Sequence, residues 1–64
     1  MKISDLQQSE MNQLVRNINT WMKYVRAEGN IADIEDALGE YSRDIARKGF
    51  TRDQVYAAWL EQFN

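Results

Sequence analysis

Apolar residues recur along the first half of the chain at helical intervals. They follow one another at spacings of 3, 4, 3 and 4, at Met11, Leu14, Ile18, Trp21 and Val25. Such spacing places side chains on one face of an α-helix, whereas a half-buried strand would alternate apolar and polar residues. Upstream, Ser4 and Gln7 form a capping box, a pattern with which helices begin. The sequence therefore predicts a long first helix over about residues 4–28.

The same intervals return after residue 30 and predict a second helix. Its apolar positions are Ile31, Ile34, Leu38, Tyr41 and Ile45. Asn30 is the expected cap, and the predicted range is about 31–48. Gly39 lies inside this pattern, where glycine is unfavourable, and it predicts either a close helix contact or a kink. We expect the helix to remain continuous through it.

A third helix is predicted after Gly49, which stands where a glycine commonly ends a helix. Thr51 and Gln54 form a second capping box, so this helix should cover about residues 52–63, with Phe50 packed against Val55. We therefore expect an all-α fold, a compact three-helix bundle in a single domain over residues 1–64. The third helix is too short to cover the first, so part of the first apolar stripe should fray or meet another chain.

The composition offers little for enzyme chemistry. The chain has no cysteine and no histidine, so thiolate nucleophiles and the commonest general base are absent. Asp33, Asp36 and Glu40 share one helical face but lack the loop sequence of a calcium site, and we interpret them as solvated acids. We therefore expect no catalytic residue, no cofactor and no metal site.

The distribution of apolar residues also bears on location. No apolar run approaches the roughly 20 residues of a membrane span, and the N-terminal segment lacks the apolar stretch of a signal peptide. We therefore expect a cytoplasmic protein that does not enter a membrane.

Charge is distributed unevenly along the chain. Eight basic and ten acidic residues give a net charge of −2. The isoelectric point of about 4.9 argues against a protein that binds nucleic acid by bulk charge. Residues 28–40 contain five acids and no base, whereas residues 43–52 contain four bases and one acid. Helix dipoles account for much of this pattern, but the acidic block could also steer a basic partner.

The polar face of the first helix carries amides and hydroxyls rather than charges. From Gln7 to Thr20 its only charged residues are Glu10 and Arg16. Uncharged polar groups cost less to desolvate than ions, and charged residues are depleted at the centres of interfaces. We therefore expect a small non-enzymatic protein-binding module, a regulator, inhibitor or accessory subunit, whose size would fit a phage or bacterial accessory protein. The predicted partner-binding residues are Gln13, Asn17, Thr20, Tyr24, Asp33, Asp36 and Glu40.

The partner of this surface is expected to be another protein of unknown identity. A second copy of the chain, forming a homodimer through the long first helix, would satisfy the same features.

The segment from Asp44 to Phe63 allows a second interpretation. Ile45, Gly49 and Val55 have the spacing of a helix-turn-helix, although Ile45 is bulky where alanine is usual. A DNA-binding regulator of this kind would use Arg43, Arg47, Lys48, Arg52, Gln54 and Tyr56. Asp53 would face the nucleic acid unfavourably, so DNA binding is the alternative rather than the favoured function.

Overall fold

The computed structural model describes residues 4–63, and this part of the chain contains helices without any strand. In chain order the helices are α1 (Asp5–Ala27), α2 (Ile34–Glu40), α3 (Ser42–Arg47) and α4 (Arg52–Phe63). The predicted all-α class is confirmed. The predicted count of three helices is wrong, because the expected second helix is two short helices.

Helix α1 begins and ends with local hydrogen bonds that the sequence encodes. The Gln7 main-chain N–H donates to Ser4 Oγ at 3.2 Å, and the Ser4 N–H donates to Gln7 Oε1 at 3.1 Å, which confirms the predicted capping box. At the other end Gly29 has φ +90°, and the Asn30 N–H donates to the Val25 carbonyl at 3.1 Å. This 6→1 bond is typical of a glycine that terminates a helix.

Helix α2 begins three residues later than the sequence predicts. Asp33, not Asn30, is its cap, because the Asp36 N–H donates to Asp33 Oδ1 at 3.0 Å and the Asp33 N–H donates to Asp36 Oδ2 at 3.3 Å. The prediction that Ile31 faces the core is therefore wrong, and its side chain is 95% exposed. Ala32 is buried in its place, and its carbonyl accepts from Arg26 Nε at 3.0 Å.

The helix break that separates α2 from α3 lies at Tyr41, which has φ −98° and ψ 13°. Tyr41 itself is bonded to both sides, since its N–H donates to the Ala37 carbonyl at 3.0 Å and its carbonyl accepts from the Ile45 N–H at 2.9 Å. Gly39 does not mark a close contact between helices, because a Cβ built on it would meet no atom within 4 Å. The continuous helix predicted through this segment is interrupted two residues after that glycine.

Helix α4 starts from a turn that combines two signals. Gly49 has φ +80°, and the Phe50 N–H donates to the Ile45 carbonyl at 3.0 Å, which ends α3. The Thr51 N–H then donates to Gln54 Oε1 at 2.8 Å, and the Gln54 N–H donates to Thr51 Oγ1 at 3.1 Å. The predicted second capping box is thus confirmed.

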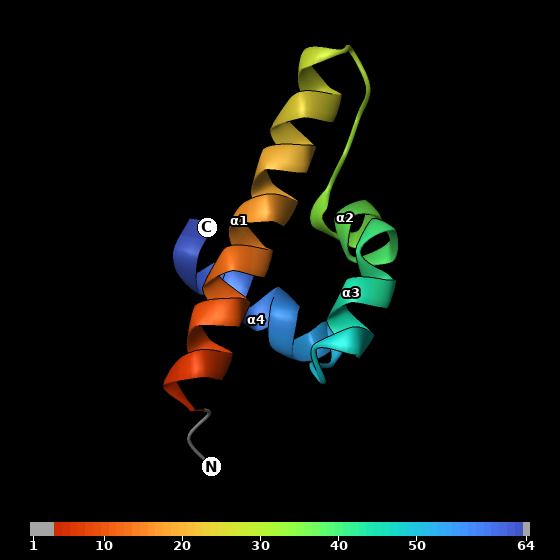
Figure 1. Ribbon diagram of the computed structural model, residues 1–64. Helices are drawn as coiled ribbons and strands as arrows, with labels where there is room; N and C mark the ends of the chain where they lie inside the picture. The colour runs from red at the N-terminus through yellow and green to blue at the C-terminus, as the bar shows by residue number, and fades with distance from the viewer. Residues whose placement is uncertain (1–3, 64) are drawn as a thin grey trace.

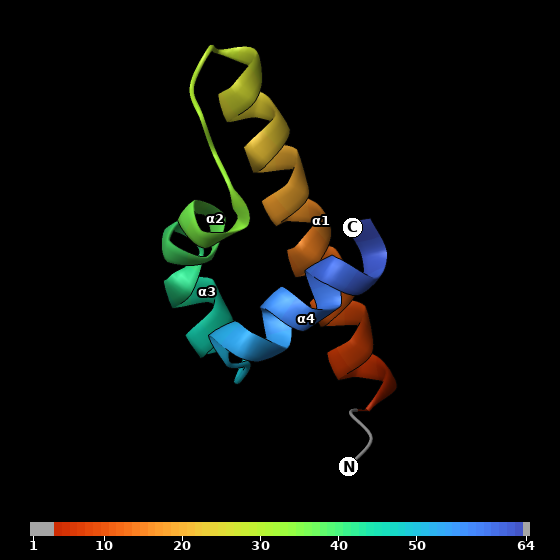
Figure 2. The same ribbon diagram turned by 180° about the vertical axis from the view of Figure 1, so that it is seen from behind.

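The core lies where the other helices meet α1. α2 and α3 lie along one side of α1, while α4 crosses its N-terminal half, as both views show (Figures 1 and 2). The buried apolar residues of this core are Met11, Leu14, Val15, Ile18, Met22, Ala37, Leu38, Ile45, Phe50 and Val55. The C-terminal turns of α1 extend past α4, with residues 28–33 returning beside them toward α2. This part of α1 therefore has a face that no other helix covers.

Candidate functional site

Four of the predicted partner-binding residues form one row on α1. Gln13, Asn17, Thr20 and Tyr24 follow one another at intervals of 4, 3 and 4, and all four are exposed. Gln13 Nε2 donates to Asn17 Oδ1 at 3.0 Å, so two of these amides are paired along the helix. Tyr24 is 67% exposed, which leaves most of its ring in water. The structure thus brings together the α1 part of the predicted surface.

A hollow of about 270 Å³ lies beside this row. Its lining residues are Asn17, Thr20, Trp21, Tyr24 and Tyr41. The rings of Trp21 and Tyr41 meet edge to face, with centroids 6.5 Å apart and an interplanar angle of 83°. Three aromatic side chains from α1 and the α2–α3 junction therefore surround a space open to solvent.

Tyr41 forms one wall of the hollow and is held there by a hydrogen bond. Its hydroxyl donates to the main-chain carbonyl of Asn17 at 3.3 Å. Burial raises the pKa of the Tyr41 hydroxyl, and the negative charges of Asp44 and Glu40 raise that pKa further. Two carboxylates thus lie close enough to Tyr41 to act on its hydroxyl.

Two of the lining residues are absent from the predicted site, because their spacing assigns them to the core. Trp21 and Tyr41 belong to the 3, 4, 3, 4 apolar stripes, but both are only partly buried. Their polar ring atoms could have indicated a role in binding, since a tyrosine or tryptophan ring often packs on the core with one edge and contacts a partner with the other. Contact between them could not be read from either helix alone.

The three predicted acidic residues do not act together. Asp33 and Asp36 cap the start of α2 through each other's main-chain N–H groups, and neither lines the hollow. Glu40 directly precedes Tyr41 and acts on its hydroxyl. Within residues 4–63 no group of three or more acidic, histidine or cysteine side chains is placed to hold a metal ion.

Part of the amide content of α1 has a structural role. Asn12 Oδ1 accepts from Gln8 Nε2 and from Gln62 Nε2, each at 2.9 Å. The second bond joins α1 to the last turns of α4, fifty residues away in sequence. Gln8 and Asn12 are therefore explained by the fold, whereas Gln13, Asn17 and Thr20 face solvent.

The basic residues at the α3–α4 turn are partly engaged. Arg52 forms an ion pair with Glu35, and Arg47 Nη1 lies 3.8 Å from Asp44 Oδ1. The Gln54 side chain accepts the Thr51 N–H, while Tyr56 is 36% exposed and Arg43 and Lys48 are exposed. Three of the six residues of the DNA-binding alternative thus already have partners within the chain.

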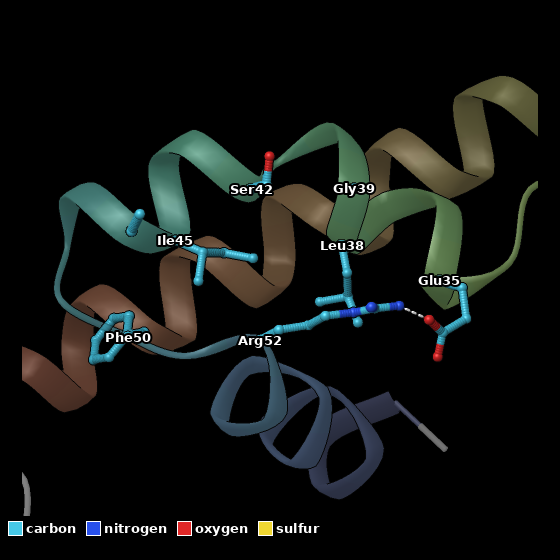
Figure 3. Close-up of a pocket in the computed structure, with 8 residues that line it drawn as sticks. Glu35, Leu38, Gly39, Ser42, Ile45, Phe50 and Arg52 are labelled. Atoms are coloured by element: carbon cyan, nitrogen blue, oxygen red, sulfur yellow. Dashed lines mark ion pairs between the residues drawn. The ribbon is translucent and has the colours of Figure 1, made fainter.

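The ion pair of Arg52 borders a second hollow, of about 360 Å³, between α2, α3 and the start of α4 (Figure 3). Leu38, Ile45 and Phe50 supply its apolar surface. In Figure 3 the Arg52 side chain reaches from α4 across to Glu35 on α2. Arg52 therefore bridges two helices rather than projecting freely from the turn.

No family model, no curated protein and no solved structure matches the chain. Among the described residues, no helix has both the length and the apolar character needed to cross a membrane.

Proposed function

We propose that this chain is a small non-enzymatic protein-binding module, a regulator, inhibitor or accessory subunit, that docks through the exposed row of α1. The observation that carries the proposal is the hollow between α1 and Tyr41, which is lined by Asn17, Thr20, Trp21, Tyr24 and Tyr41. It adjoins the surface that the sequence predicts for partner binding. Its volume of about 270 Å³ is below the range of roughly 300–1,000 Å³ usual for small-molecule pockets, and thus better suits a single side chain.

The energetics of the row favour burial against a protein. Gln13, Asn17 and Thr20 are uncharged, so a partner that covers them displaces water from amides and hydroxyls rather than from ions. Tyrosine and tryptophan are enriched among the residues that dominate interface energies, because they bury a large rigid surface. Tyr24, at 67% exposure, has the most ring surface to gain among the lining aromatics.

Charge would orient the partner. Glu40 and Asp44 act on the Tyr41 hydroxyl, so a basic partner surface would be attracted to the Tyr41 side of the hollow. Such attraction acts mainly on the association rate and weakens as salt is added.

The proposal is tested by affinity capture from the cytoplasm of the source cells, followed by mass spectrometry. Asn17→Arg places a long cation in the centre of the row and should abolish capture of the specific partner. Ala57→Arg adds the same charge at an exposed position of α4 and should leave capture intact. If Asn17→Arg releases no protein that the wild type retains, the proposed docking surface is wrong. Capture of a second tagged copy of the same chain would identify the partner as a homodimer.

A further inference from the structure

We infer that the hollow between α1 and Tyr41 receives a cationic side chain of the partner, arginine or lysine, against the rings of Trp21, Tyr24 and Tyr41. The inference rests on the proposed function, since it names the chemistry of the partner residue that this surface binds. It follows from two features of the hollow, its aromatic walls and its charge.

The aromatic walls suit a cation better than an aliphatic side chain alone. A guanidinium or ammonium group is attracted to the face of a tryptophan or tyrosine ring when it lies within about 6 Å of the ring centroid. Trp21 and Tyr41 both line the hollow and stand edge to face at an interplanar angle of 83°, so their ring faces point in different directions. Tyr24 adds a third ring from the next turn of α1. Arginine and lysine can also lay their aliphatic stems along such rings.

The charge around Tyr41 has the complementary sign. Glu40 precedes Tyr41 in the chain and Asp44 follows one turn later, and both act on the Tyr41 hydroxyl. Asp44 is shared with the exposed Arg47 at 3.8 Å, whereas Glu40 forms no salt bridge within the described residues. Glu40 is therefore the carboxylate on this side whose charge is not already paired.

Two bases of α1 flank the Thr20 edge of the hollow. Arg16 and Lys23 are four residues before and three residues after Thr20, so they share its side of the helix. Trp21 is turned about 100° from Thr20 toward α2 and Tyr41. A cation that rests against Tyr41 meets the two acids that act on its hydroxyl, whereas a carboxylate would have to rest against aromatic faces with negative quadrupoles.

A titration with a small model compound tests the inference directly. The probe is N-acetyl-arginine methylamide, followed by NMR at the Trp21 indole N–H, with the buried indole N–H of Trp59 as internal reference. We expect saturable shifts at Trp21 and at the Tyr24 and Tyr41 rings, and none at Trp59. The neutral isostere N-acetyl-citrulline methylamide should produce much smaller shifts. Equal shifts with the citrulline compound, or larger shifts with N-acetyl-glutamate methylamide, would overturn the inference.

Two variants locate the site. Tyr24→Ala should weaken binding of the arginine compound about two- to fivefold, the loss expected for one exposed cation–π contact. Glu40→Gln should also weaken binding, and the difference from the wild type should be largest at low salt, because the lost attraction is electrostatic. Tyr56→Ala and Glu61→Gln make the same changes on α4 and should leave binding unaltered. An effect of the α4 variants equal to that of Tyr24→Ala would count against the site.

The failure of this inference differs from the failure of the proposed function. If the arginine compound does not bind but Asn17→Arg still releases the captured protein, the docking surface stands and the cationic occupant is wrong. If the compound binds but Asn17→Arg releases nothing, the hollow does not serve a protein partner and the inference falls together with the proposed function.

Discussion

The hydroxyl of Tyr41 donates a hydrogen bond of 3.3 Å to the main-chain carbonyl of Asn17, in the middle of α1. This bond joins the α2–α3 junction to the long helix, and the same tyrosine ring packs edge to face on Trp21. One side chain therefore contributes both to the stability of the bundle and to the wall of the candidate binding hollow. The two contributions can be separated, because removing the hydroxyl leaves the ring in place.

Tyr41→Phe should destabilise the fold slightly and leave the shape of the hollow intact. The lost hydrogen bond is partly exposed, so we expect a decrease of about 0.5–1 kcal/mol in the free energy of unfolding. Urea denaturation followed by circular dichroism measures the difference. Tyr24→Phe is the matched control, since Tyr24 is exposed and its hydroxyl makes no hydrogen bond within the described residues. A loss as large for Tyr24→Phe would show that the Tyr41 bond has no specific role.

The raised pKa of Tyr41 predicts a dependence of stability on high pH. Burial, then Asp44 and Glu40, make the ionised hydroxyl less favourable in the folded chain than in the unfolded chain, whose reference value is 10.0. The folded state therefore holds the proton more tightly, and its stability falls as the pH rises above 10.0 toward the folded pKa. At lower pH the Tyr41 hydroxyl is protonated in both states and does not contribute to the pH dependence of stability.

Urea midpoints measured between neutral pH and about pH 11 test the assignment to Tyr41. The fall in stability should be smaller in Tyr41→Phe than in the wild type, because the variant has no hydroxyl to ionise at this position. Every other titratable group is common to both proteins. Parallel curves for the two proteins would contradict the prediction.

The signals within one turn of helix were sufficient to predict much of the fold. Ser4 with Gln7, and Thr51 with Gln54, are capping boxes in both sequence and structure. Each capping box depends only on two residues three positions apart, so it forms with little influence from tertiary contacts. The long α1 was likewise predicted from local signals, its capping box and the helical spacing of its apolar residues.

The start of α2 could not be chosen correctly by spacing alone. Asn30 and Asp33 are both good caps, and the apolar period continues backwards to Ile31. The reciprocal pairing of Asp33 with Asp36, which the sequence also displays, selects the later start. Ala32, whose carbonyl accepts from Arg26 of α1, is then buried instead of Ile31. The start of α2 is thus a local choice, whereas the contact of Ala32 with Arg26 joins two segments and is not contained in the periodicity.

The candidate site was predictable on one helix and not across two. The row from Gln13 to Tyr24 is a property of α1 and could be found from its lack of charge. The hollow needs Tyr41, and its approach to Trp21 depends on the break between α2 and α3. The 3, 4, 3, 4 spacing of apolar residues continues through Tyr41, so the sequence pattern does not reveal the break.

Two glycines should respond in opposite ways to replacement by alanine. Gly49→Ala forces a Cβ into a conformation with φ +80° and should destabilise the fold by about 1–2 kcal/mol. Gly39→Ala adds a methyl group that meets no atom within 4 Å inside α2, and should stabilise the fold by about 0.5–1 kcal/mol. Thermal unfolding of the two variants beside the wild type measures both effects. A destabilised Gly39→Ala would mean that this glycine is required for the turn at Tyr41.

The ion pair between Arg52 and Glu35 separates the proposed function from DNA binding. Because both side chains are largely exposed, the pair should contribute no more than about 1 kcal/mol, and Arg52→Glu should leave the chain folded. A helix-turn-helix would instead use Arg52 and Arg47 on phosphates, so its DNA affinity would fall steeply with salt and be lost in Arg47→Glu and Arg52→Glu. We expect neither charge reversal to affect capture of the protein partner, and we expect no salt-dependent binding to a mixed-sequence duplex in fluorescence anisotropy. Duplex binding that both reversals abolish would favour the DNA-binding alternative, whereas loss of the protein partner on Asn17→Arg alone would favour docking through α1.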